Sequence, residues 1–324
     1  MTAGSDEPIR AASGHGNPTS DDLTSHSGER RAPVLNSFGL SIGQTATMAC
    51  LLEASVPKPG NVHRGADFAD MTFYDFALSA ALIGPAMEAA GESGPGLAAL
   101  RAVEATRRWV PRNTNLGTIL LLAPLAAAAS SVGNATSTAT AGPPKKTIAE
   151  SIPGMLASLD ADDARHVYAA IQLAQPGGLG EVAEADVSAE PPLDLQYAMN
   201  LAADRDLVAR QYVNGFAEVL EFVVPALARG TEAGWSLPDS IIHTAVQLMH
   251  AYPDSLIARK CGPATAVQAA QYAGMVLEAG GPGDREYLGA LSDLDFWMRS
   301  DGHRRNPGTT ADLVAAGLFV AIWE

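Results

Sequence analysis

Charged side chains gather in short segments of the sequence whose residue types suit the binding of phosphate and a divalent cation. Lys58 stands between two prolines, which limit the directions in which its ammonium can leave the backbone, and Arg64 adds a second cation nearby. Asp67 and Asp70 follow three residues apart, so both carboxylates could reach one Mg²⁺ on a turn or helix. Asp70 could equally cap the helix that we expect from Thr72.

Two further groups of polar residues lie at or within predicted helices. Asn115 ends a run of Asn and Thr before a strongly apolar stretch, where such residues cap a helix and its free amides can bind an anion. Asp206 and Arg210 are four residues apart, and an exposed pair of this kind contributes only about 0.3–0.5 kcal/mol. The residues around this pair are mostly apolar, and charges on a mostly buried helix are more often functional.

The last two groups combine carboxylates with hydroxyls or cations. Asp254 precedes Arg259 and Lys260 by five and six residues, which could bring metal and phosphate together, although Asp254 could also be a helix N-cap. Thr309 and Asp312 have the spacing of a capping box. A phosphate at this helix start would meet Asp312 as a like charge, and a divalent cation between them would remove the conflict.

Helical periodicity dominates the elements that must position these groups. Apolar residues recur at spacings of three and four from Ser41 almost to the end, alternating strands are missing, and no internal repeat is found. We therefore predict an all-α fold, a single multi-helix bundle. The expected helices are 41–55, 72–90, 96–109, 114–130, 160–174, 204–229, 236–251, 262–280 and 309–323.

Composition divides the chain into a tail and one domain. Residues 1–36 are rich in Ser, Gly, Asp, Thr and Pro without a hydrophobic period, so we expect a disordered tail followed by a helical domain at 37–324. Two interruptions are expected inside the domain. Residues 130–146 suit a flexible connection, and the glycines within 175–193 suit a tight turn, a close approach to a ligand or a simple helix stop.

The bulk composition excludes several classes of partner. A formal net charge of −15 disfavours nucleic acid and anionic lipid, which attract basic surfaces. The most apolar stretch, 116–129, is shorter than the roughly 20 residues that span a bilayer, so a buried helix and no membrane are expected. Cys50 and Cys261 have no metal-like spacing, and the N-terminus lacks a signal peptide pattern. These features predict a cytoplasmic protein.

Six motifs, in order, resemble the triphosphoribosyl-dephospho-CoA synthase family from about Ser41 to the C-terminus. They are PKPGNVHR with DFADMTF, TNLGTILLLAPLAAA, PGGLGEV, DRDLVARQYVNGF, PDSLIARKCG and NPGTTADLVAAGLF. The resemblance implies an all-helical enzyme that joins ATP to 3'-dephospho-CoA, releases adenine and leaves a triphosphoribosyl group on the acceptor. In the family this product is the precursor of the prosthetic group of acyl-carrier subunits in citrate and malonate lyase systems.

One departure from the family pattern concerns the acceptor. Lyase-associated members typically carry a Gly-Gly pair and Ser where this chain has Gly-Thr-Thr at 308–310, and their first motif differs after PKPG. The chain is more similar to the divergent branch of archaea and of organisms with tetrahydromethanopterin-type pathways. The nucleotide chemistry is therefore the firmer expectation, and the acceptor stays open.

The family reaction suggests roles for the charged groups. Displacing adenine passes through an oxocarbenium-like state, which needs a negative group and a base for the incoming hydroxyl, while Mg²⁺ and cations hold the triphosphate. The catalytic candidates are Asp70, Asp254 and Asp312, and the metal candidates are Asp67, Asp70 and Asp312. The candidates for binding ATP and the acceptor are Lys58, Arg64, Asn115, Asp206, Arg210, Arg259, Lys260 and Thr309.

Other interpretations differ in the acceptor or in the class of protein. The same nucleotide chemistry could serve a pterin or another one-carbon carrier, and water as acceptor would make the chain a hydrolase. A non-catalytic nucleotide-binding protein is an alternative of another class. The apolar helices also leave room for a homodimer.

Overall fold

The computed structural model describes residues 1, 39–132, 146–176 and 191–324. The tail expected at 1–36 and most of the two interruptions expected at 130–146 and 175–193 lie outside the described residues. The described residues from 39 onward belong to one compact unit that extends from Ala32 to Glu324.

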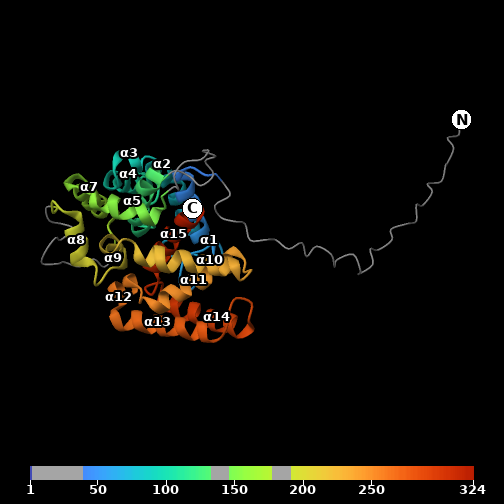
Figure 1. The fold of residues 1–324 in the computed structure, drawn as a ribbon. Helices are drawn as coiled ribbons and strands as arrows, with labels where there is room; N and C mark the ends of the chain where they lie inside the picture. Colours follow the sequence, from blue (N-terminus) through green and yellow to red (C-terminus); the bar gives the residue numbers. More distant parts are fainter. Residues whose placement is uncertain (2–38, 133–145, 177–190) are drawn as a thin grey trace. The chain divides into compact units, whose positions relative to one another are not determined.

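The regular elements within this described part are helices, which confirms the predicted all-α class (Figure 1). The first half contains α1 (Ile42–Ser55), α2 (Phe73–Glu88), α3 (Ala90–Ser93), α4 (Pro95–Arg107), α5 (Leu116–Val132), α6 (Ile148–Ala157) and α7 (Ala161–Ala174). The second half contains α8 (Leu195–Ala202), α9 (Leu207–Asn214), the π-helix η2 (Glu218–Val223), α10 (Val224–Glu232), α11 (Leu237–Ala251), α12 (Ser255–Cys261), α13 (Pro263–Glu278), α14 (Arg285–Arg299) and α15 (Gly308–Trp323).

Side-chain caps define where several helices begin. Ser41, Thr72 and Thr147 each accept a hydrogen bond from the backbone three residues ahead, and an acidic or amide side chain there bonds back to the cap. Asp160 caps α7 in the same reciprocal way. Two donors that would otherwise be unsatisfied are paired at each start, so these boundaries follow from local sequence.

The single long helix predicted at 204–229 is wrong, because the chain breaks at the end of α9. Gly215 and Phe216 both have positive φ, 72° and 65°, which ends α9. Glycine adopts this conformation readily, whereas Phe216 is strained there and is held by complete burial of its ring. The π-helix η2 and α10 follow as separate elements.

Five helices of the described residues were not predicted: α3, α6, α8, α12 and α14. The helices α8 and α12 have only eight and seven residues, too few to display a clear period. The helix α14 is long, but it buries only Tyr287, Leu294 and Met298 and carries many charges. A narrow apolar stripe gives a weak signal, because most of the helix surface faces solvent.

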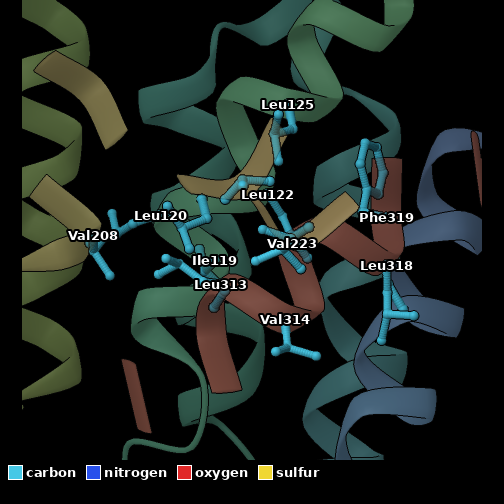
Figure 2. Close-up of a cluster of buried hydrophobic side chains, with 14 of the residues drawn as sticks. Ile119, Leu120, Leu122, Leu125, Val208, Val223, Leu313, Val314, Leu318 and Phe319 are labelled. Atoms are coloured by element: carbon cyan, nitrogen blue, oxygen red, sulfur yellow. The ribbon is translucent and has the colours of Figure 1, made fainter. Parts of the chain in front are cut away.

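The centre of the fold is the contact between two very apolar helices, α5 and α15. In Figure 1, α15 in red lies between helices α1 to α5 and the orange helices α11 to α14, and it contacts α1, α5, α10, α11 and α12. Figure 2 shows the side chains of Leu122, Val223, Leu313 and Phe319 meeting where α5, η2 and α15 converge. These four residues belong to the buried hydrophobic cluster. Burial of both helices on nearly every face therefore fixes where their N-termini lie.

The apolar helix α5 is buried in the core, as its sequence predicts. Twelve of its 17 residues are buried, including Pro124 inside the helix. Across the described part of the chain, the search for a helix of the length and apolarity that a bilayer crossing needs finds none.

Truncation of a fully buried leucine of α5 tests the importance of this core. Leu121 is completely buried, so Leu121→Ala should lower the free energy of unfolding by about 2–5 kcal/mol through lost burial and a residual cavity. Leu288 on α14 is 52% exposed, and Leu288→Ala should change stability by at most about 0.5 kcal/mol. Chemical denaturation measures both, and equal effects would contradict a core centred on α5.

Candidate active site

A cavity of about 720 Å³ lies where the helix starts and connecting segments converge. This volume is within the roughly 300–1,000 Å³ of pockets that hold small molecules. Residues of α1, α5, α7, α8, α9, α12 and α15 line it, together with parts of the connections that precede α2, α5, α9 and α15. Polar segments far apart in the sequence therefore share one space.

Asp312 lies in this cavity, one turn into α15, against the start of α5. Its carboxylate accepts a hydrogen bond of 2.6 Å from the hydroxyl of Thr118. Gly117 permits the approach, since a Cβ at that position would overlap the Asp312 carboxylate. The close packing of two helices thus places a carboxyl group on the wall of the cavity.

The surroundings of Asp312 strongly favour its neutral form. Burial raises the pKa of the Asp312 carboxyl to about 8, and the charges of Glu53, Asp254 and Asp206 add to the effect. The hydrogen bond from Thr118 acts in the opposite direction, because it stabilises the carboxylate. A pKa this close to neutrality suits a group that exchanges a proton during a reaction.

Lys58 is engaged by the protein and does not line the cavity. Its ammonium contacts the carboxylate of Glu53 at 2.8 Å and also donates to the backbone carbonyls of Glu53 and Val56. The side chain is only 1% exposed. These acceptors use the three donors of an ammonium. The donors of Lys58 therefore close the end of α1, and its role in ligand binding stays a prediction.

Asp254 is also satisfied by protein groups. It is completely buried; one carboxylate oxygen caps α12 through the amides of Leu256 and Ile257, and the other accepts from the amide and hydroxyl of Thr310. Burial raises its pKa, and these hydrogen bonds oppose the rise. Asp254 is absent from the cavity lining and joins α12 to α15, and its catalytic role stays a prediction.

Arg259 and Lys260 line the cavity as predicted and supply its positive charge. The guanidinium of Arg259 donates to Asp206 at 3.1 Å, while its buried Nε has no hydrogen-bond partner among the described residues. Asp206 itself caps α9 through two backbone amides. Burial, followed by the charge of Arg259, lowers the pKa of the Lys260 ammonium. Both side chains are therefore placed where an anion in the cavity could bind them.

Asn115 and Thr309 place polar groups at the starts of α5 and α15, again on the cavity wall. The Nδ2 of Asn115 is buried and has no hydrogen-bond partner in the described part of the chain. The hydroxyl of Thr309 accepts from Ser255 at 2.9 Å and remains able to donate. An unpaired buried amide is costly, so Asn115 fits a site that a ligand completes.

The remaining candidates have different surroundings. Asp70 lines the cavity and lies 3.4 Å from Nε2 of His303. The carboxylate of Asp67 accepts from the amide of Phe73 at 2.7 Å, and Asp67 is outside the cavity lining. Arg64 is exposed and also outside it. Arg210 donates to the carbonyl of Ala203 and lies 3.6 Å from Glu218. Arg210 is outside the cavity lining, and its assignment to ligand binding stays a prediction.

A comparison with protein-family models decides among the interpretations of this cavity. The model for ATP:dephospho-CoA triphosphoribosyl transferases matches residues 40–324. The chain belongs to this family. The predicted family, the enzyme class and the transfer of a triphosphoribosyl group from ATP are thereby confirmed, and nothing in the comparisons favours the alternative functions.

A solved structure has the same fold as this transferase. It is a crystal structure from Archaeoglobus fulgidus that carries the provisional description of a triphosphoribosyl-dephospho-CoA synthase. The two sequences are 26% identical, the match covers 76% of this chain and 97% of that chain, and the TM-score is 0.55. No curated protein matches the transferase.

Three charged residues of the transferase cavity were absent from the predicted site: Glu53, Arg112 and Arg205. Glu53 is the one charged residue of α1. A single charge on an apolar helix could have indicated a site residue, because such groups are seldom buried without a partner. Arg205 directly precedes Asp206 in the sequence, and Arg112 lies three residues before Asn115. Their exposure to the cavity depends on the fold, which the local sequence does not reveal.

The contact between Gly117 and Asp312 can be tested with a single methyl group. Gly117→Ala should lower kcat roughly a hundredfold, because displacing a reacting group by about 1 Å has effects of this size. Gly289 on α14 has no atom within 4 Å of an added Cβ, so Gly289→Ala should leave kcat unchanged and stabilise the helix by about 0.5–1 kcal/mol. Adenine release and thermal unfolding measure both; equal activities would contradict the proposed contact.

For the substrate-free protein in the presence of a metal chelator, the raised pKa of Asp312 predicts that the free energy of unfolding depends on pH. The folded carboxyl keeps its proton up to about pH 8, whereas the unfolded chain releases it near pH 4. The unfolding free energy of the wild-type chain, relative to Asp312→Asn, should therefore fall between about pH 4 and pH 8 and level off above. Urea denaturation of both proteins across this range gives the difference, and a constant difference would contradict the pKa.

Proposed function

We propose that this chain transfers the triphosphoribosyl group of ATP to dephospho-CoA within the cavity beside Asp312. The bond between the anomeric carbon and adenine breaks, a bond from that carbon to an acceptor hydroxyl oxygen forms, the hydroxyl loses its proton and adenine takes one up. One observation supports this site best: the cavity brings together a buried carboxyl group and two cations. It also contains two buried hydrogen-bond donors that have no partners in the described residues, and the chain belongs to the transferase family.

Asp312 is the proposed general base and electrostatic partner of the reacting carbon. Its pKa of about 8 lies near the operating pH, which maximises the efficiency of a proton acceptor. Once ionised, the carboxylate can stabilise positive charge that develops on the ribose ring in the transition state. Thr118 and Gly117 hold the carboxyl in place, so it needs little reorganisation during the reaction.

The triphosphate is proposed to bind Arg259, Lys260 and the start of α15. Arg259 has an unpartnered buried Nε, and the pKa of Lys260 is lowered by burial and by its neighbour, so an anion would relieve an unfavourable pair of like charges. Asn115 and Thr309 are proposed to orient ribose or phosphate oxygens, because each offers a donor at a helix start.

Mg²⁺ is proposed to enter with the triphosphate. In nucleotide enzymes this ion is usually held by one or two carboxylates and by phosphate oxygens, and it neutralises phosphate charge when bound. Within the described ranges no group of three or more His, Cys, Asp or Glu side chains is placed to hold a metal. Asp70, a partly exposed carboxylate on the cavity wall, is the chemically suitable ligand. The homodimer and the cytoplasmic location stay predictions.

The decisive assay follows adenine release from ATP and Mg²⁺ with and without dephospho-CoA. We expect release that depends on the acceptor, with a mass gain on the acceptor equal to one triphosphoribosyl group. Asp312→Asn should lower kcat by roughly 10²–10⁴-fold through loss of the base, with little change in the KM for ATP. Asp301, a partly exposed acid near Arg304, supplies the control variant Asp301→Asn, which should retain full activity.

Two results would count against the proposal. Adenine formed at the same rate without acceptor would make the chain a hydrolase of the nucleotide. Wild-type activity in Asp312→Asn would remove the assigned role of Asp312, and the reacting carbon would then have to lie elsewhere in the cavity.

A further inference from the structure

One side of the cavity is formed by α7 and α8, which contact each other. On α7, Tyr168 and Ile171 line the cavity, and Gln175 at the end of the helix completes a spacing of three and four residues. Residues at this spacing share one helical face. The face that α7 turns to the cavity is therefore mostly carbon, with one neutral amide at its end.

The helix α8 presents a matching face. Ala198, Met199 and Ala202 line the cavity from α8, and Arg205 lies one further turn along the chain. We call the following cavity-lining residues the α7–α8 wall: Tyr168, Ile171, Gln175, Ala198, Met199 and Ala202. This wall carries no charged side chain, and Arg205 stands at its end.

Arg205 differs from the other cations of the cavity in its surroundings. Its side chain is exposed, and among the residues that the structure describes its guanidinium makes no hydrogen bond and no ion pair. Arg259, in contrast, is largely buried and pairs with Asp206. An exposed arginine that lines the cavity and has no partner in the described part of the chain is available for an external anion.

The transfer reaction brings two different anions to one cavity. ATP carries a triphosphate, and dephospho-CoA carries a diphosphate attached to a pantetheine arm, which is long, uncharged and largely carbon. A cavity of about 720 Å³ is of the size that encloses one drug-sized ligand, so part of the second substrate must lie toward the rim. An apolar wall that ends at a free cation matches the pantetheine arm and its diphosphate, and ATP has no comparable arm.

We propose that the α7–α8 wall and Arg205 form the acceptor subsite, in which Arg205 binds the diphosphate of dephospho-CoA and the wall holds the pantetheine arm. The proposal rests on the proposed function and adds the location of the second substrate. Arg205 and Ala202 then determine acceptor affinity, and Arg259 and Lys260 determine affinity for ATP. The two phosphate groups bind separate cations, which keeps the acceptor diphosphate away from the reacting ribose.

Steady-state kinetics of Arg205→Met test the subsite. Loss of a charged hydrogen bond should raise the KM for dephospho-CoA roughly tenfold, while kcat and the KM for ATP stay within about twofold of the wild-type values. Arg205→Lys, which keeps the charge, should recover part of the affinity. Arg101 is exposed on α4 and lies outside the cavity, so Arg101→Met is the matched control and should leave every constant unchanged.

Ala202→Asp tests the wall itself. Ala202 is only half-buried, so the fold can accept the new side chain, and its charge should weaken the binding of an uncharged arm without affecting ATP. A raised KM for ATP, or unchanged constants for dephospho-CoA in both Arg205→Met and Ala202→Asp, would overturn the subsite while leaving the transferase activity in place.

Direct titration of the protein with dephospho-CoA alone keeps this test independent of turnover. If the wild-type protein binds dephospho-CoA but releases no adenine, the proposed function fails, and weaker binding by Arg205→Met still supports the subsite. Equal binding by wild-type protein and Arg205→Met, or no binding by either, would overturn the subsite.

Discussion

The packing of Gly117 against the carboxyl group of Asp312 is the contact on which the site depends. It requires α5 and α15 to approach so closely at their N-termini that a side-chain methyl group would not fit between them. That approach is possible because both helices are buried on nearly every face and are held by the surrounding elements. The most hydrophobic part of the sequence therefore fixes the position of its most unusual acid.

The same arrangement brings groups of like charge together in a buried site. A carboxyl group beside Glu53 and Asp206 in a low-dielectric setting destabilises the folded state whenever it is ionised. Arg259 and Lys260 are likewise adjacent cations; Arg259 is paired with Asp206, and burial and the charge of Arg259 lower the pKa of Lys260. Functional sites commonly keep such local conflicts, and the large apolar core supplies the stability that tolerates them.

Local sequence predicted the elements better than it predicted the partners of charged side chains. The helices α5 and α15 were expected because they are long and apolar, and α1 and α11 because side-chain caps also mark their starts, whereas the break at Gly215 and Phe216 depends on tertiary burial of the phenyl ring. Asp312, Asn115, Thr309 and Arg259, which the sequence suggested as site residues, line the cavity. Lys58 and Asp254 do not line it, and local sequence could not reveal this, because a charge near a proline or a helix start has the same local pattern whether it faces a ligand or the protein. Only long-range contacts, such as the one from Asp254 to Thr310, separate the two cases.

The buried Asp254 gives the two halves of the site a common mechanical support. One carboxylate oxygen holds the start of α12, which carries Arg259 and Lys260, and the other holds the first turn of α15, which carries Asp312. Four hydrogen bonds to one fully buried carboxylate therefore join the two helix starts. Asp254, which lies outside the cavity lining, thereby sets the relative position of the cations on α12 and the carboxyl group on α15.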